Sequence, residues 1–204
     1  MARSVFRFLS RQPDYPELAD GTLVLRLPDY GDFRQWHRLR HASRAFLQPW
    51  EPTWRSDELT EASFRVRVSR NRQEYASGLS VPLFIFDSRD MTLLGGITIG
   101  HIRKGAAQNC MIGYWMGAVH AGKGHMFAAV RLVIPYIFEG LRLHRIEAAC
   151  IPDNERSIRL LEKSGFEREG LLRKYLKING EWRDHLMFSL IAENDRQDGR
   201  SASS

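Results

Sequence analysis

Residues 81–116 read VPLFIFDSRDMTLLGGITIGHIRKGAAQNCMIGYWM, and this stretch decides the fold class. Residues 81–87 and 91–102 are apolar runs of strand type joined by the short turn SRD, and residues 108–116 form a third run. Three consecutive strands with no helix between them predict antiparallel hairpins. They exclude a doubly wound parallel sheet, in which helices alternate with strands.

After the third strand, the chain passes through a glycine-containing segment into an apolar helix. A helix is expected over residues 123–139, because Phe127, Val130, Ile134 and Ile137 recur there at helical spacing. Pro135 lies inside this range and should kink or shorten the helix, since proline lacks a backbone N–H.

The remaining elements are placed by caps and turns. A strand is expected over 21–27, helices over 30–47 (capped by Asp29) and 58–77 (capped by Ser56 or Asp57), a strand over 144–151, a helix over 154–164, and two long strands around Asn179-Gly180. The sequence thus predicts an α/β (α+β) protein with a mixed, mostly antiparallel twisted sheet of about seven strands and about four helices. Residues 1–20 are expected to form an N-terminal arm, 21–193 a single domain, and 194–204 a disordered tail.

Length and composition are those of one ordinary globular domain. The 204 residues carry a net charge of +6, which favours anionic partners such as nucleic acid or a phosphorylated ligand, but the arginines are scattered. No apolar run reaches the roughly 18 residues of a membrane span, and the basic start is too interrupted for a secretory signal. We therefore expect a cytoplasmic protein whose two cysteines, Cys110 and Cys150, are reduced.

Residues 113–126, GYWMGAVHAGKGHM, run from a strand through a glycine-containing turn directly into a helix. Free N–H groups at a helix start bind anions, and glycine lets a phosphate approach the backbone. Residues 117–123 also fit the G-x-x-x-x-G-K pattern of a P-loop. That alternative fails because Gly124 stands where Ser or Thr would hold magnesium, and because the hairpins contradict a mostly parallel sheet.

Several motifs in this order resemble the GNAT superfamily of N-acetyltransferases, and most closely its ribosomal-protein alanine N-acetyltransferases. The resemblance rests on PWEPTW, QNCMIGYWMG, GKGHMFAAV, HRIEAACIPDNERSIRLLEKSGFEREG and INGEWRDHLMFSL, and it covers roughly residues 21–193. It implies splayed central strands, acetyl-coenzyme A as co-substrate, no metal, and direct acetyl transfer to an amine.

The resemblance also implies site residues. The coenzyme A pyrophosphate would be held by the backbone of Ala121, Gly122, Lys123, Gly124, His125 and Met126, and the pantetheine arm would pair with Met116, Gly117 and Ala118. Asn154 would hydrogen-bond the cofactor arm, and Ser157 would protonate the leaving thiolate. The sequence departs from the family consensus at Val119, His120 and Ala121, where the family often has larger or polar residues.

Local chemistry adds Glu51, in the Trp- and Pro-rich loop PWEPTW, as a group that could take the proton from the acceptor ammonium, and His101 as a further candidate. The expected acceptor is a primary amine, such as the N-terminus of a ribosomal protein. A small-molecule amine (an antibiotic or polyamine) or a non-catalytic coenzyme A- or RNA-binding protein remain alternatives. We expect no membrane association, no direct nucleic acid contact, and a monomer or homodimer.

Overall fold

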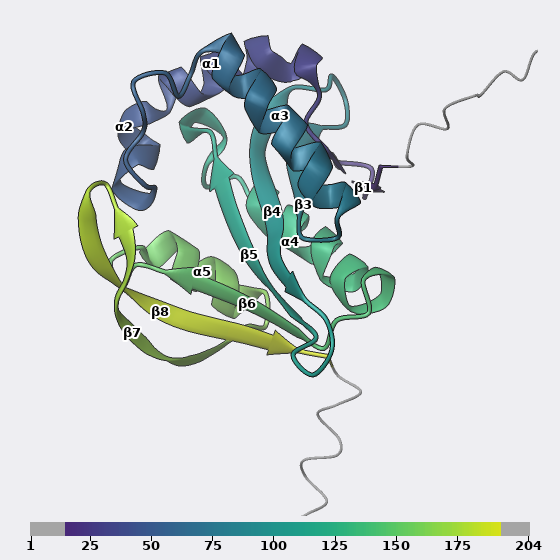
Figure 1. The fold of residues 1–204 in the computed structure, drawn as a ribbon, viewed down its shortest axis with the longest axis vertical. Coiled ribbons are helices and arrows are strands. Elements are labelled where there is room, and N and C mark those ends of the chain that lie inside the picture. The colour runs from purple at the N-terminus through teal and green to yellow at the C-terminus, as the bar shows by residue number, and fades with distance from the viewer. Residues whose placement is uncertain (1–14, 193–204) are drawn as a thin grey trace, which may run out of the picture.

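The computed structural model describes residues 15–192, which form helices around one eight-stranded sheet (Figure 1). The strand order is β1-β2-β3-β4-β5-β6-β8-β7. The strands are β1 (Glu17–Ala19), β2 (Leu23–Arg26), β3 (Val81–Asp87), β4 (Leu93–Arg103), β5 (Asn109–Met116), β6 (Arg145–Cys150), β7 (Glu167–Ile178) and β8 (Glu181–Ile191). Every neighbouring pair is antiparallel except β5 and β6, so the predicted mixed, mostly antiparallel sheet is confirmed.

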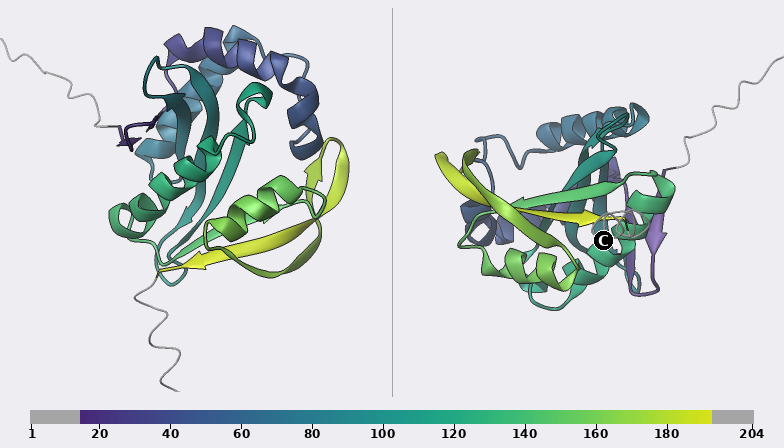
Figure 2. Two further views of the ribbon diagram at one scale, coloured as in Figure 1. Left: turned by 180° about the vertical axis from the view of Figure 1, so that it is seen from behind. Right: turned by 90° about the horizontal axis from the view of Figure 1, so that it is seen from below.

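The helices cover both faces of the sheet. They are α1 (Phe33–Ala42), α2 (Arg44–Leu47), α3 (Glu61–Ala76), α4 (His125–Pro135) and α5 (Glu155–Lys163), with short 3-10 turns at Tyr30–Asp32, Gln48–Trp50 and Ala118–His120 and a π-helical turn at Tyr136–Gly140. Figures 1 and 2 show α1 and α3 over one face and α4 and α5 over the other. Each face has its own apolar core, the smaller of which contains Trp36, Leu39, Phe64, Val68, Phe84, Phe86 and Leu93.

The described residues contain one strand and one helix more than the sequence predicts. The additional strand, β1, lies within the expected N-terminal arm. The additional helix arises because the helix expected over 30–47 is interrupted at Ser43, whose side chain accepts a hydrogen bond from the Ala118 N–H (2.9 Å). This bond ties the α1–α2 junction to the end of β5.

One predicted helix cap is wrong, because α3 is capped by Thr60, whose Oγ1 accepts the Ser63 N–H (3.2 Å), and not by Ser56 or Asp57. Asp29 caps the helical segment that begins at Tyr30, as predicted, although its first turn is a 3-10 turn that leads directly into α1. The proline in the expected helix over 123–139 also acts as predicted, because α4 ends there and a π-helical turn follows.

The central opening of the sheet positions the site. β5 and β6 pair at only three positions, from Asn109–Arg145 to Met111–Glu147, whereas β5 stays paired with β4 as far as Met116. Beyond Met111 the two parallel strands therefore diverge, as the resemblance implied. The chain then enters α4 from the end of β5 and α5 from the end of β6, which brings both helix N-termini to the opening.

Candidate active site

A cleft of about 780 Å³ occupies the opening between β5 and β6. Its walls are the N-terminal parts of α4 and α5 and the segment around Trp50. Apolar side chains supply much of the lining, namely Phe46, Leu47, Trp50, Tyr114, Met116, Phe127 and Leu160. The cleft is therefore suited to a long ligand with apolar parts.

The turn before α4 supplies the polar part of the cleft. Gly122 and Gly124 have φ angles of 75° and 84°, in the left-handed region that favours glycine. Gly124 is the N-cap of α4, so the N–H groups of the first turn, including those of His125 and Met126, have no partner within the helix. They line the cleft together with the positive end of the helix dipole, which makes this turn an anion site.

Asn154 and Ser157 face the cleft from α5. Asn154 caps the helix, and its Oδ1 accepts the Ser157 N–H (3.1 Å), which leaves its amide Nδ2 as a donor for a ligand. Ser157 is 9% exposed, and its Oγ lies 2.6 Å from the Tyr114 hydroxyl. Burial raises the pKa of Tyr114 well above its ordinary value, so this hydroxyl stays protonated. Either hydroxyl can be the donor in this bond, and when Tyr114 donates, the serine hydrogen is left for another acceptor.

Tyr114 is not among the residues that the sequence predicts. A signal was present, because Tyr114 and Met116 are two residues apart on β5 and therefore share one face of the strand. The distance to Ser157 could not be anticipated, since it depends on how α5 packs against β5.

Glu51 is held by an ion pair. Arg40 donates to both of its carboxylate oxygens (2.7 and 2.6 Å), and Trp54 Nε1 donates to Oε2 (2.7 Å). The Arg40 guanidinium lies over the rings of Trp54 (4.3 Å) and Trp115 (5.0 Å). Both carboxylate oxygens are therefore occupied by hydrogen-bond donors of the protein, and the pair joins α1 to the loop at Glu51. The arrangement favours a structural role over the predicted role of general base.

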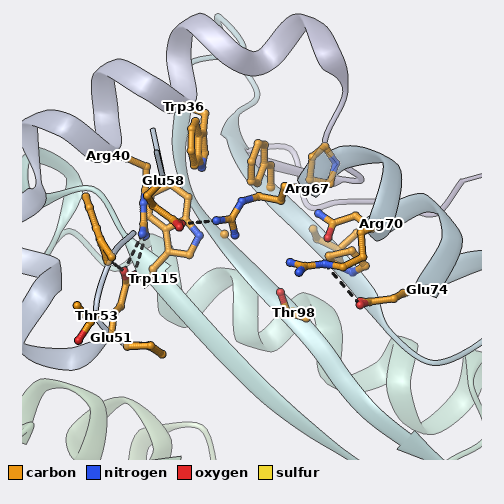
Figure 3. A pocket seen from close by; sticks show the side chains of 18 residues that line it. Trp36, Arg40, Glu51, Thr53, Glu58, Arg67, Arg70, Glu74, Thr98 and Trp115 are labelled. Carbon is orange, nitrogen blue, oxygen red and sulfur yellow. Dashed lines mark hydrogen bonds and ion pairs between the residues drawn. The ribbon is translucent and has the colours of Figure 1, made fainter. Parts of the chain in front are cut away.

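A second cavity, a groove of about 440 Å³, lies on the α1 and α3 side of the sheet (Figure 3). Its floor includes Phe84, Thr98 and Trp115, and its walls come from α1, α3 and the loop at Glu51. Trp115 can lie across β4 because Gly96 has no side chain, since a Cβ there would stand 2.6 Å from the indole Nε1. Glu51 and Trp115 line both cavities, so the groove and the cleft meet at these two residues.

Three arginine–glutamate pairs line the groove (Figure 3). They are Arg40–Glu51 (2.6 Å), Arg67–Glu58, and Arg70–Glu74 (3.7 Å). Apart from Glu51, none of these residues is predicted from the sequence, because each one by itself is an ordinary charged residue on a helix or loop.

Comparison with known proteins assigns the family. The acetyltransferase (GNAT) domain profile matches residues 22–167. The chain belongs to the GNAT acetyltransferase family. It is 36% identical to a probable N-acetyltransferase of Bacillus subtilis, YjcK (86% of this chain, 97% of that one), and 31% identical to the [ribosomal protein uS5]-alanine N-acetyltransferase of Escherichia coli (91% and 95%). A solved structure of Mycobacterium smegmatis RimJ in complex with CoA-disulfide is 34% identical, with a TM-score of 0.81 and 88% of each chain covered.

This acetyltransferase uses acetyl-coenzyme A, and the cleft has the features that this co-substrate requires. Most of the predicted cofactor residues line it: Met116, Ala121, Gly122, Gly124, His125, Met126 and Asn154. Gly117, Ala118 and Lys123 do not. The Gly117 N–H donates to Leu94 O (2.9 Å) and the Ala118 N–H to Ser43 Oγ, so neither is free for the pantetheine arm.

The Met116 backbone has a different orientation. Because Gly117 turns its N–H toward β4, the preceding residue turns its backbone N–H and C=O the other way, to the side that β6 has left open. Among the predicted strand residues, Met116 is therefore the one whose backbone N–H and C=O are open to the cleft.

The charges around the cleft suit a polyanionic ligand. Glu155 pairs with Arg159 (2.9 Å) and Asp153 with Arg183 (3.1 Å), while the Arg156 guanidinium lies over the Phe46 ring (5.2 Å). Arg159 and Arg183 therefore offset these two carboxylates, and Arg156 adds a further cation beside the cleft. Within residues 15–192 no group of three or more His, Cys, Asp or Glu side chains is placed to hold a metal ion, and no helix there is long and apolar enough to cross a membrane.

Proposed function

We propose that this enzyme transfers the acetyl group of acetyl-coenzyme A to the N-terminal α-amine of a protein, such as a ribosomal protein. The observation that carries the proposal is the groove that meets the cofactor cleft at Glu51 and Trp115 from the opposite face of the sheet. A chain end can enter such a groove and present its amine to the thioester. The similarity to the uS5-alanine N-acetyltransferase supports this choice of acceptor.

The charges of the groove argue against a polyamine acceptor. A polycation would be bound by unpaired carboxylates, but Glu51 and Glu58 each accept hydrogen bonds from an arginine, and Glu74 accepts one from Ser80. A peptide backbone instead requires hydrogen-bonding groups and apolar surface. The groove offers Thr98 and Asn71 for the first and Trp36, Phe84 and Trp115 for the second.

The proposed reaction is a direct transfer. The neutral amine attacks the thioester carbonyl carbon, the C–N bond forms, and the C–S bond breaks with its electron pair moving to sulfur. Ser157 Oγ–H donates a proton to the departing thiolate, and Tyr114 fixes the serine hydroxyl in that orientation. The Met116 N–H, on the open side of β5, is the proposed donor to the carbonyl oxygen. The proton released by the amine passes to water in the groove, and Ser157 regains a proton from solvent, which restores its hydroxyl.

The cysteines support direct transfer over an acetyl-cysteine intermediate. The chain has two cysteines, Cys110 and Cys150, and both are buried. Burial raises the pKa of Cys110 to about 12 and also raises that of Cys150, so neither is present as the thiolate that a nucleophile requires.

The test is intact-mass analysis of candidate acceptors after incubation with acetyl-coenzyme A. A mass increase of one acetyl group, located at the N-terminus by fragmentation, supports the proposal. Transfer to spermidine or an aminoglycoside, with none to protein N-termini, would replace it with the small-molecule alternative. Binding of coenzyme A without transfer to any amine would favour a non-catalytic protein.

A further inference from the structure

One face of α3 lines the acceptor groove with an unusual set of side chains. Arg67, Arg70, Asn71 and Glu74 follow one another at helical spacing, so they occupy the same side of the helix. Figure 3 shows Arg67 and Arg70 projecting from this helix toward the strand that carries Thr98. The arginines thus lie inside the groove, beyond its junction with the cofactor cleft.

Arg67 is incompletely neutralised. Its Nη2 donates to Glu58, and this is the one hydrogen bond of its guanidinium among the described residues. Its side chain is 33% exposed, so its other N–H groups can be reached from the groove. Its pKa is lowered, chiefly by burial and further by the charges of Arg40 and Arg70, although Glu58 opposes the shift. A partly buried cation with donors to spare gains stability from an additional anion.

Arg70 is the second half of this site. Its Nε lies 3.7 Å from Glu74, which is too long for a hydrogen bond, and 61% of its side chain is exposed. Its planar donor edge is therefore available to a carboxylate that enters the groove.

The position of the two arginines sets where such an anion lies on the acceptor. The helix rises about 1.5 Å per residue, so the groove wall from Arg67 to Glu74 is roughly 10 Å long. An extended peptide advances about 3.4 Å per residue, so this wall spans about three residues. With its amine at Glu51 and Trp115, a chain that follows the groove passes this wall within its first few residues.

We propose that Arg67 and Arg70 form an anion subsite of the acceptor groove, which selects acceptors with a carboxylate one to three residues after the acetylated residue. This inference rests on the proposed function, which it refines to N-termini with an early Asp or Glu. A carboxylate at the same place could also be the C-terminus of a short peptide, and the experiment separates the two sources.

The experiment compares ten-residue peptides with alanine first and Glu, Gln or Lys at position 2, 3 or 4, by kcat/KM. At one or more of these positions, the glutamate peptide should be acetylated about tenfold faster than the glutamine peptide, with lysine slowest, since one partly buried ion pair is gained. Ala-Gly-Gly with a free carboxylate, compared with its amide, tests the short-peptide source.

Variants assign the preference to the arginines. Arg70→Gln should reduce the ratio of kcat/KM for the glutamate peptide to kcat/KM for the glutamine peptide. Arg70→Glu should shift the preference toward the lysine peptide. The double variant Arg67→Gln/Glu58→Gln removes the inner pair without leaving a buried charge alone. Arg65→Gln is the matched control, because Arg65 is exposed on α3 outside the groove and lies over the Tyr30 ring (4.8 Å). This control should keep the wild-type ratio.

The outcomes are distinct. Equal rates for the glutamate, glutamine and lysine peptides at all positions, with transfer intact, overturn the anion subsite and leave the proposed function standing. A ratio unchanged in both Arg70 variants and in the double variant also overturns it. A preference for the free tripeptide acid, with none for internal glutamate, keeps the subsite and assigns it to the C-terminal carboxylate of short peptides. No transfer to any free N-terminus, while small amines are acetylated, refutes the protein acceptor and with it this refinement.

Discussion

The cofactor cleft and the acceptor groove are built in different ways. The polar part of the cleft comes from two short continuous segments, the turn into α4 and the start of α5, and its contacts use backbone amides and helix caps. The groove draws its side chains from α1, α3, the loop at Glu51 and three neighbouring strands. A site made from backbone groups can be predicted from local glycine and capping patterns in the sequence, whereas a site made from side chains of distant segments cannot.

The largest expected effect lies in the groove wall. Arg40→Met should lower the free energy of unfolding by about 3 kcal/mol, because it leaves Glu51 without its partner in a pair whose side chains are only 7% and 19% exposed. Urea denaturation measures this. The double variant Arg40→Met/Glu51→Leu should recover part of the loss. A change below about 1 kcal/mol in the single variant would mean that the pair does not hold the wall.

In the cleft, weakening the binding of acetyl-coenzyme A requires a change of backbone conformation. Gly124→Val should raise the KM for acetyl-coenzyme A at least about tenfold, because a β-branched residue at φ 84° is strained and the turn must shift. Nothing in the protein lies within 4 Å of the new Cβ, so overlap with protein atoms does not contribute. Gly105→Val is the matched control, since Gly105 also has positive φ (67°) and open surroundings but lies outside the cleft. It should lose similar stability and keep the wild-type KM, and an equal KM increase in both variants would refute the assignment.

The Ser157–Tyr114 pair tests the chemistry at the cleft. Ser157→Ala should lower kcat about 100-fold with little change in KM, near the low end for a general acid because a thiolate leaves readily. Tyr114→Phe should lower kcat about tenfold, as expected for one lost hydrogen bond. The double variant should be no slower than Ser157→Ala alone, because the tyrosine acts through the serine. Additive losses would show that Tyr114 acts independently.

Glu51→Gln separates a structural role from a proton-transfer role. We expect a loss of roughly fivefold in kcat/KM that is uniform from about pH 6 to 9, since the substitution weakens the bonds to Arg40 and Trp54. A loss concentrated at low pH, where the acceptor amine is protonated, would restore Glu51 as the general base.

The smallest effect is expected at an ion pair outside both cavities. Arg145 and then Ser189 lower the pKa of Glu169 to about 2, so the pair stabilises the fold above the ordinary glutamate pKa of 4.5, and this contribution is lost as pH falls toward 2. Because the Glu169 side chain is 42% exposed, Glu169→Gln should cost less than about 1 kcal/mol at pH 7. The difference from wild type should vanish near pH 2 in urea denaturation. A loss of unfolding free energy as large as that expected for Arg40→Met would show that exposed and buried ion pairs do not differ here as proposed.

Much of the fold follows from residues close together in sequence. The hairpins of β3–β5 and the β7–β8 pair around Asn179-Gly180 follow from alternation and turn residues, and the Asn154 cap from local preference. The division of the expected first helix at Ser43 was not predictable, because it depends on a bond to Ala118, 75 positions away. The same applies to the loss of Gly117 and Ala118 as cofactor donors, since their N–H groups bond to distant partners.

The sequence by itself determined the series of strands from β2 to β8, the glycine turn with its free amides, and the helix that presents Ser157. Each depends on preferences of neighbouring residues, which act over a few positions whatever surrounds them. Only the tertiary structure decided that Tyr114 contacts Ser157, that Arg40 occupies both oxygens of Glu51, and that Arg67 and Arg70 line the acceptor groove. Those contacts exist because the sheet opens between β5 and β6 and helices pack on both of its faces, which places side chains from distant segments within hydrogen-bond distance.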